Sequence, residues 1–130
     1  MAQNSFFLVF LGGGLGSVTR YAVSRYVQPW LGPSFPAGTL LVNVVASLVL
    51  GLVAGWMAGR QGGETVRLLV GVGFCGGLST FSTFSTDTLA LLQQGRILSA
   101  ILNILLNVVL CLLVSWLGFA AGLHKLRSIL

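Results

Sequence analysis

Four long apolar segments organise the chain, and only short breaks separate them. The segments cover about 4–26, 38–59, 66–92 and 97–122, and the breaks contain charged residues, glycine pairs or proline. A transmembrane helix needs about 20 mostly apolar residues, so each segment is long enough to cross a bilayer. The pattern therefore predicts an all-α membrane protein of four antiparallel transmembrane helices, with both chain ends on one side of the membrane.

Small and polar residues recur at every fourth position in two of these segments. In the second segment the positions are Thr39, Asn43, Ser47, Gly51, Gly55 and Gly59. In the fourth segment they are Ser99, Asn103, Asn107, Cys111 and Ser115. This spacing places them along one face of each helix, and glycine on such a face lets a second helix approach closely. For Asn43, an interhelical hydrogen bond and a place in a polar pathway are both open interpretations.

The third segment has the most unusual sequence. Residues 73–85 read GFCGGLSTFSTFS, in which glycines precede a run of hydroxyl-bearing residues. Because glycine disfavours helix, we expect the third helix to be broken at its middle. A membrane tolerates such a break only where it is buried in protein or lines a cavity. Phe81 and Phe84, three residues apart, would share a face of the helix that resumes after the break.

The composition agrees with a membrane protein and leaves no room for a second domain. Of 130 residues, 55% are hydrophobic and 7% are charged, whereas soluble domains carry about 25% charged residues. We therefore expect residues 1–130 to form one transmembrane domain. The net charge of +5 comes from scattered basic residues, so nucleic acid is not an expected partner. His124 has no Ser or Cys partner implied by spacing, and we expect no enzyme activity.

The basic residues are divided almost evenly between the two predicted sides of the membrane. One side would carry Arg60, Arg67, Lys125 and Arg127, and the other Arg20, Arg25 and Arg96. An excess of Lys and Arg normally sets the orientation of a membrane protein, so this balance would let the chain insert in both directions. Oppositely inserted copies could then pair. A single orientation set by another signal is the alternative.

The polar groups inside the predicted membrane region are mostly hydrogen-bond donors. They are Asn amides and Ser and Thr hydroxyls, and Asp87 is a carboxylate near the end of the third segment. Donors without embedded acids favour an anion. The edges of aromatic rings are also positive, so Phe81 and Phe84 could meet a small anion edge-on. The alternatives are a small four-helix multidrug or cation antiporter, which needs an embedded carboxylate, and a non-transporting membrane assembly subunit.

Three motifs in order resemble the bacterial fluoride channels of the Fluc (CrcB) family. They are GGGLGSVTRY at 12–21, PAGTLLVNVVAS at 36–47 and GFCGGLSTFSTFS at 73–85. The resemblance implies an antiparallel, dual-topology homodimer in the bacterial inner membrane, with two fluoride pores and a structural Na⁺ at the dimer centre. It also implies export of fluoride from the cytoplasm by passive permeation, which lowers fluoride toxicity.

The resemblance further implies roles for single residues. The residues of the fluoride pathway would be Asn43, Thr80, Phe81, Ser82, Thr83, Phe84 and Arg20. Within this set, the Asn43 amide and the two ring edges would contact the ion, the hydroxyls would line a polar track, and Arg20 would lie at the entrance vestibule. The backbone carbonyls of Gly76 and Ser79 would bind the Na⁺.

Three positions depart from the residues that are usual in the family. Ser79 stands where threonine is common, a change that a contact through the backbone carbonyl would not sense. Asp87 replaces glutamate and has a shorter reach. Cys111 replaces a hydroxyl with a much weaker donor. The participation of the fourth segment in the pathway is therefore left open.

Overall fold

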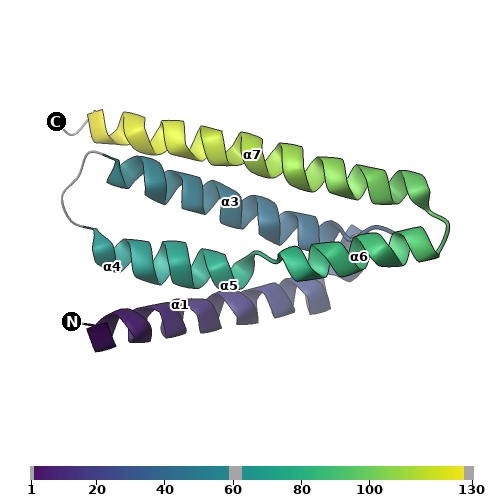
Figure 1. Ribbon diagram of the computed structural model, residues 1–130, viewed down its shortest axis with the longest axis horizontal. Coiled ribbons are helices and arrows are strands. Elements are labelled where there is room, and N and C mark those ends of the chain that lie inside the picture. The colour runs from purple at the N-terminus through teal and green to yellow at the C-terminus, as the bar shows by residue number, and fades with distance from the viewer. Residues whose placement is uncertain (1, 59–62, 128–130) are drawn as a thin grey trace.

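The computed structural model describes residues 2–58 and 63–127, which are helical except in short connections. The described spans long and apolar enough to cross a membrane are Asn4–Leu31, Ala37–Met57, Glu64–Gln93 and Ile97–His124. They run back and forth side by side, and both chain ends lie at the same end of the bundle (Figure 1). The expected all-α protein with four membrane-spanning helices is confirmed. Gly59, Arg60 and the side chains of Lys125 and Arg127 lie outside the part described.

The spans are built from α-helices and two π-helical stretches, marked η. The described elements, in chain order, are α1 (Ala2–Ala22), η1 (Val23–Val27), α2 (Gln28–Leu31), α3 (Ala37–Met57), α4 (Glu64–Val66), η2 (Arg67–Cys75), α5 (Gly76–Leu78), α6 (Phe81–Gln93) and α7 (Ile97–Arg127). In Figure 1, α7 lies along α3, and α1 lies along the segment from α4 to α5.

The first span is longer than the hydrophobic pattern predicts, because Pro29 does not end it. The helix continues through η1 into α2, and Pro29 falls in the first turn of α2. Proline removes one main-chain hydrogen bond from the continuing helix, and the π-helical turn η1 directly before α2 accommodates this interruption. The span ends instead at Gly32, whose φ of 109° favours glycine.

Glycines allow the main chains of α3 and α7 to lie in direct contact. A Cβ added to Gly51 would collide with the main-chain carbonyl of Ser115 in α7, and Gly55 faces the carbonyl of Phe119 in the same way. The glycine stripe predicted from the sequence therefore serves close helix packing, as expected. The reciprocal contacts, in which glycines of α7 face carbonyls of α3, are Gly118 with Leu48 and Gly122 with Leu52.

The third span keeps its glycines in helix and leaves the helical conformation after them. Gly73 and Gly77 lie against the backbone of α1, where a larger residue would collide. Ser79 and Thr80 are extended, with ψ of 153° and 114°, and α6 begins at Phe81. The hydroxyl-rich stretch therefore forms the first turns of α6, while the glycine-rich stretch is used for packing on α1.

Candidate functional site

The site is centred on the extended pair between α5 and α6. In a continuous helix the N–H of Thr80 would donate to the carbonyl of Gly76, but here it donates to Asn43 Oδ1 at 2.8 Å. The Nδ2 of Asn43 donates to Asn107 Oδ1 on α7 at 2.9 Å. Asn43 thus connects α3, the extended pair and α7, and the interhelical hydrogen bond considered from the sequence is present.

Three hydroxyls form one hydrogen-bonded cluster at the start of α6. Thr80 Oγ1 accepts from the N–H of Thr83 at 3.1 Å and so caps the helix. The same hydroxyl donates to Thr83 Oγ1 at 2.9 Å and shares a hydrogen bond of 3.2 Å with Ser82 Oγ. Thr80 is buried, whereas Ser82 and Thr83 are exposed. The structure therefore brings together the three residues predicted for the polar track.

The two phenylalanines of the motif contact each other but differ greatly in exposure. Their ring centroids are 5.4 Å apart and the ring planes are inclined by 52°. Phe84 is 9% exposed, whereas Phe81 is 80% exposed on the single chain. A cavity of about 250 Å³ is lined by Asn43, Ser47, Ser79, Thr80, Phe81, Phe84, Asn107, Val108 and Cys111. We call it the aromatic cavity, and Asn107, Val108 and Cys111 bring the fourth span into its wall.

Arg20 lies at a neighbouring cavity, which it shares with part of the hydroxyl cluster. Its half-buried side chain comes from the last turn of α1. The cavity measures about 240 Å³ and is lined by Ser17, Arg20, Tyr21, Ser24, Gly38, Thr39, Val42, Thr80 and Thr83. Arg20 is therefore near the hydroxyls and does not line the aromatic cavity, while Thr80 lines both.

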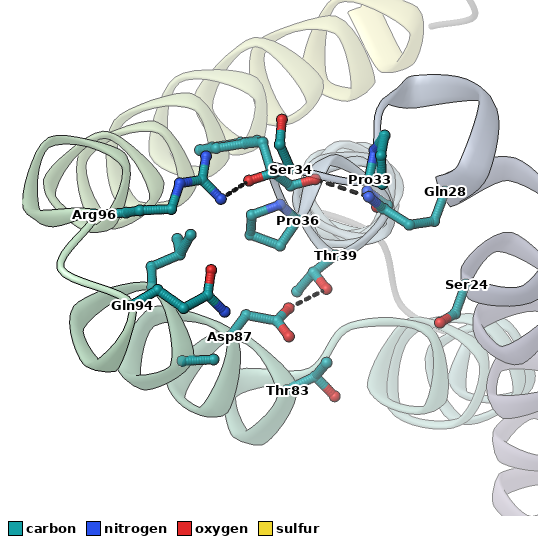
Figure 2. A pocket seen from close by; sticks show the side chains of 14 residues that line it. Ser24, Gln28, Pro33, Ser34, Pro36, Thr39, Thr83, Asp87, Gln94 and Arg96 are labelled. Carbon is teal, nitrogen blue, oxygen red and sulfur yellow. Dashed lines mark hydrogen bonds between the residues drawn. The ribbon is translucent and has the colours of Figure 1, made fainter.

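A third cavity of about 250 Å³ opens beyond Thr83, beside the loop between α2 and α3 (Figure 2). Thr39 donates its hydroxyl to Asp87 Oδ2 at 2.7 Å. Arg96 donates to the carbonyl of Ser34 and to Ser99 Oγ, so it ties the loop to the start of α7. The sequence indicates Asp87 but not its partner, although Thr39 lies on the polar face of the second segment.

The segment around Gly76 offers main-chain oxygen rather than acidic ligands. Because Thr80 donates elsewhere, the carbonyl of Gly76 lacks its usual helical donor. Gly76 is exposed, and it lines a cavity of about 510 Å³ together with Ser79. Within residues 2–58 and 63–127, no three His, Cys, Asp or Glu side chains gather as a metal site. Main-chain carbonyl oxygens are ligands that suit a hard monovalent cation, as the carbonyls of unwound helix segments do in transporters.

Comparisons with known proteins agree with the motifs. Residues 7–119 match the family described as CrcB-like protein, Camphor Resistance (CrcB). A protein of Shewanella loihica named Fluoride-specific ion channel FluC is 46% identical over 116 residues, which are 89% of this chain and 94% of the relative. A protein of the same name from Pseudoalteromonas translucida is 43% identical over 119 residues, which are 91% of this chain and 99% of the relative.

A third relative from Shewanella baltica, also named Fluoride-specific ion channel FluC, is 45% identical over 116 residues, or 89% of this chain and 94% of the relative. The family match covers nearly all of the four spans and includes the segments that build the four cavities. The family resemblance inferred from the motifs is confirmed. The chain therefore belongs to the CrcB family.

Proposed function

We propose that this chain forms a fluoride-specific ion channel, which exports fluoride from the cytoplasm by passive permeation and lowers its toxicity. The chain moves an ion without chemical conversion and is not an enzyme. The observation in the structure that carries the proposal is the lining of the aromatic cavity. Its lining residues carry amides, hydroxyls, a thiol and two aromatic rings, and they include no carboxylate, ammonium or guanidinium group.

A small anion needs partners that replace its water without trapping it. Neutral N–H and O–H donors and the positive edges of rings attract fluoride less strongly than a full charge does, which permits rapid release. We infer that Asn43, Phe81 and Phe84 contact the ion in the aromatic cavity. The cluster of Thr80, Ser82 and Thr83 then continues the path towards Arg20, whose charge raises the local concentration of anions at the entrance.

The two other functions considered from the sequence lack comparable support. An antiporter of drugs or cations needs an acid within the membrane, but the carboxylate of Asp87 accepts the Thr39 hydroxyl near the end of its span. A purely structural subunit would have no use for a cluster of hydroxyls beside two rings. The relatives described above are, moreover, named as ion channels.

We infer that two copies assemble as an antiparallel homodimer with dual topology in the bacterial inner membrane. Four membrane spans make the chain a multi-pass protein, and the balance of basic residues favours insertion in both directions. Phe81 has 80% of its surface exposed, although it belongs to the aromatic cavity. A second copy would supply the missing wall beside this ring.

Dual topology can be tested with a single cysteine at Asn4, an exposed residue near the N-terminus. In native membranes, a membrane-impermeant maleimide should label Asn4→Cys in comparable amounts from either side. The unmodified chain serves as the control for background labelling, because Cys75 is buried and Cys111 is half-buried. Labelling from one side alone would exclude dual topology.

A structural Na⁺ is proposed at the carbonyls of Gly76 and Ser79, at the centre of the dimer. The freed carbonyl of Gly76 and the exposure of this residue on the single chain support this position. When bound, Na⁺ would supply positive charge that joins the two copies. Backbone carbonyls do not titrate, and the residues that line the cavity beside them include no carboxylate, so we expect binding of Na⁺ not to be coupled to movement of fluoride.

The fluoride function is tested by ion-selective electrode measurements of efflux from liposomes that contain the purified protein. We expect rapid efflux of fluoride and little efflux of chloride, and a Na⁺ gradient alone should not accumulate fluoride. Phe81→Ile should lower fluoride efflux about tenfold, because the apolar bulk is kept while the positive ring edge is lost.

Phe10→Ile is the matched control, since Phe10 is 77% exposed on α1, away from the aromatic cavity. It should leave efflux unchanged. Equal transport of fluoride and chloride by the unmodified protein would refute the proposed function. Equal efflux from both phenylalanine variants would instead remove Phe81 from the pathway and leave it a packing residue.

A further inference from the structure

A series of hydrogen bonds leaves Asn43 and returns to α6 by way of α7. Asn43 donates to Asn107, whose Nδ2 donates to the main-chain carbonyl and to Oδ1 of Asn103, both at 3.0 Å. Asn103 donates its Nδ2 to Thr88 Oγ1 at 2.9 Å, and Thr88 donates its hydroxyl to the carbonyl of Phe84 at 2.7 Å. We call Asn43, Asn107, Asn103 and Thr88 the amide relay.

Main-chain groups at the two ends determine the direction of the amide relay. The N–H of Thr80 can only donate, so it must meet the oxygen of Asn43, whose nitrogen then faces α7. The carbonyl of Phe84 can only accept, so the hydroxyl of Thr88 must donate to it and accept from α7. Turning over one amide would bring two donors or two acceptors together, and the orientation of Asn43 is therefore fixed.

Three members of the amide relay are deeply buried, and the fourth, Asn43, is half-buried. Asn103 is 0% exposed, Asn107 6% and Thr88 8%. In the described part of the chain, every buried side-chain nitrogen and oxygen has a hydrogen-bond partner. Burying polar groups is costly unless they are paired. The ends of the relay lie at Thr80 and Phe84, so it holds the turn with the two rings against α3 and α7.

The amide relay also decides which hydrogen of Asn43 remains available. One hydrogen of its Nδ2 is used in the bond of 2.9 Å to Asn107. The other faces the carbonyl of Thr80 at 3.4 Å, which is long for a hydrogen bond. Asn43 and Thr80 both line the aromatic cavity, so this weakly bonded hydrogen is the one that a small anion could take over.

We propose that Asn103, Asn107 and Thr88 are positioning residues for anion permeation, because they hold Asn43 with its weakly bonded hydrogen at the aromatic cavity. The proposal rests on the fluoride function proposed above and concerns the orientation of its donor. The most distant member is Thr88, which acts through the two amides of α7. Its effect on the ion therefore depends on an unbroken relay.

Liposome efflux of fluoride tests the proposal with paired variants at one position. Thr88→Val keeps the shape of the side chain but removes the hydroxyl, and should lower efflux about tenfold. Thr88→Ser keeps the hydroxyl and should stay close to the unmodified protein. Thr19→Val is the matched control, because Thr19 also donates to the carbonyl four residues earlier, at 2.8 Å, but on the exposed face of α1.

Asn107→Leu interrupts the amide relay at another point and tests it independently of whether Thr88→Val folds. Fluoride efflux through Asn107→Leu should fall about as far as efflux through Thr88→Val. The double variant Asn107→Leu with Thr88→Val should be no slower than the slower single variant, since a series of bonds needs to be broken only once. Independent packing defects would instead multiply, and thermal melting of each variant separates loss of fold from loss of transport.

The outcomes separate this proposal from the proposed function. If the unmodified protein transports fluoride while Thr88→Val, Thr88→Ser and Thr19→Val all match it, the positioning role is wrong and the channel function stands. Multiplying losses in the double variant would likewise overturn the relay. Absence of fluoride efflux from the unmodified protein would overturn both.

Discussion

Asn43→Asp is expected to lower fluoride efflux by nearly three orders of magnitude. The substitution keeps the size of the side chain and exchanges an amide for a carboxylate in the aromatic cavity. Two unit negative charges ~4 Å apart, in surroundings with an effective dielectric constant of ~20, repel each other by about 4 kcal/mol. Each ~1.4 kcal/mol added to the barrier costs about a factor of ten in rate.

The hydrogen bonds of Asn43 make the same substitution unfavourable for a second reason. A carboxylate can still accept from the N–H of Thr80, but its other oxygen would then face Asn107 Oδ1, to which Asn43 Nδ2 now donates at 2.9 Å. Asn107 cannot turn over to relieve this, because its own nitrogen already donates to two oxygens of Asn103. The variant loses its donor to the ion and part of its support.

Electrode recordings of efflux, with size-exclusion profiles of each protein, measure the effect of Asn43→Asp. Asn4→Asp makes the same chemical change at an exposed position on α1 and should transport like the unmodified protein. Normal efflux from Asn43→Asp would place Asn43 outside the fluoride path and leave it as an interhelical contact.

Gly51→Val is expected to prevent assembly of the fold or to destabilise it by about 3 kcal/mol, the upper part of the usual range for overpacking. A Cβ at Gly51 would collide with the main-chain carbonyl of Ser115, which cannot move aside as a flexible side chain can. α3 and α7 would have to separate, and Asn43 would then lose its contact with Asn107.

Thermal melting followed by size exclusion measures the stability of the Gly51 variant. Gly14→Val is the matched control, because no atom beyond the neighbouring backbone of its own helix lies within 4 Å of the position that its Cβ would take. This control should melt no lower than the unmodified protein, since glycine inside a helix is itself unfavourable. Similar melting of the two variants would contradict the close approach of α3 to α7.

The number and type of the spans follow from local sequence, whereas one boundary does not. Long apolar segments predict membrane helices because their length must match the bilayer. The apolar pattern predicts that the first span ends near residue 26, but the helix continues to Leu31. Pro29 looks like a helix breaker in sequence, and the apolar pattern does not indicate the π-helical turn η1 that precedes it and continues the span.

The candidate site was only partly predictable. The unusual run of hydroxyls and phenylalanines marked the start of α6, and the four-residue spacing put Asn43 on a polar face. The spacing could not name the partners of Asn43, because Thr80 and Asn107 are 37 and 64 residues away in sequence. The hydrogen bond between Thr39 and Asp87 cannot be predicted from the spacing for the same reason, because the two residues are 48 positions apart in sequence.

The glycine contacts between α3 and α7 also limit which mechanical movements the bundle can make. Gly51 and Gly55 sit over main-chain carbonyls of α7, while Gly118 and Gly122 sit over those of α3. Axial sliding of either helix by less than a full repeat would drive branched side chains into these carbonyls. Alternating access by sliding of α3 along α7 is therefore opposed by contacts with the backbone itself. Along α3 and α7, the movements that remain are those of side chains and of the permeating ion.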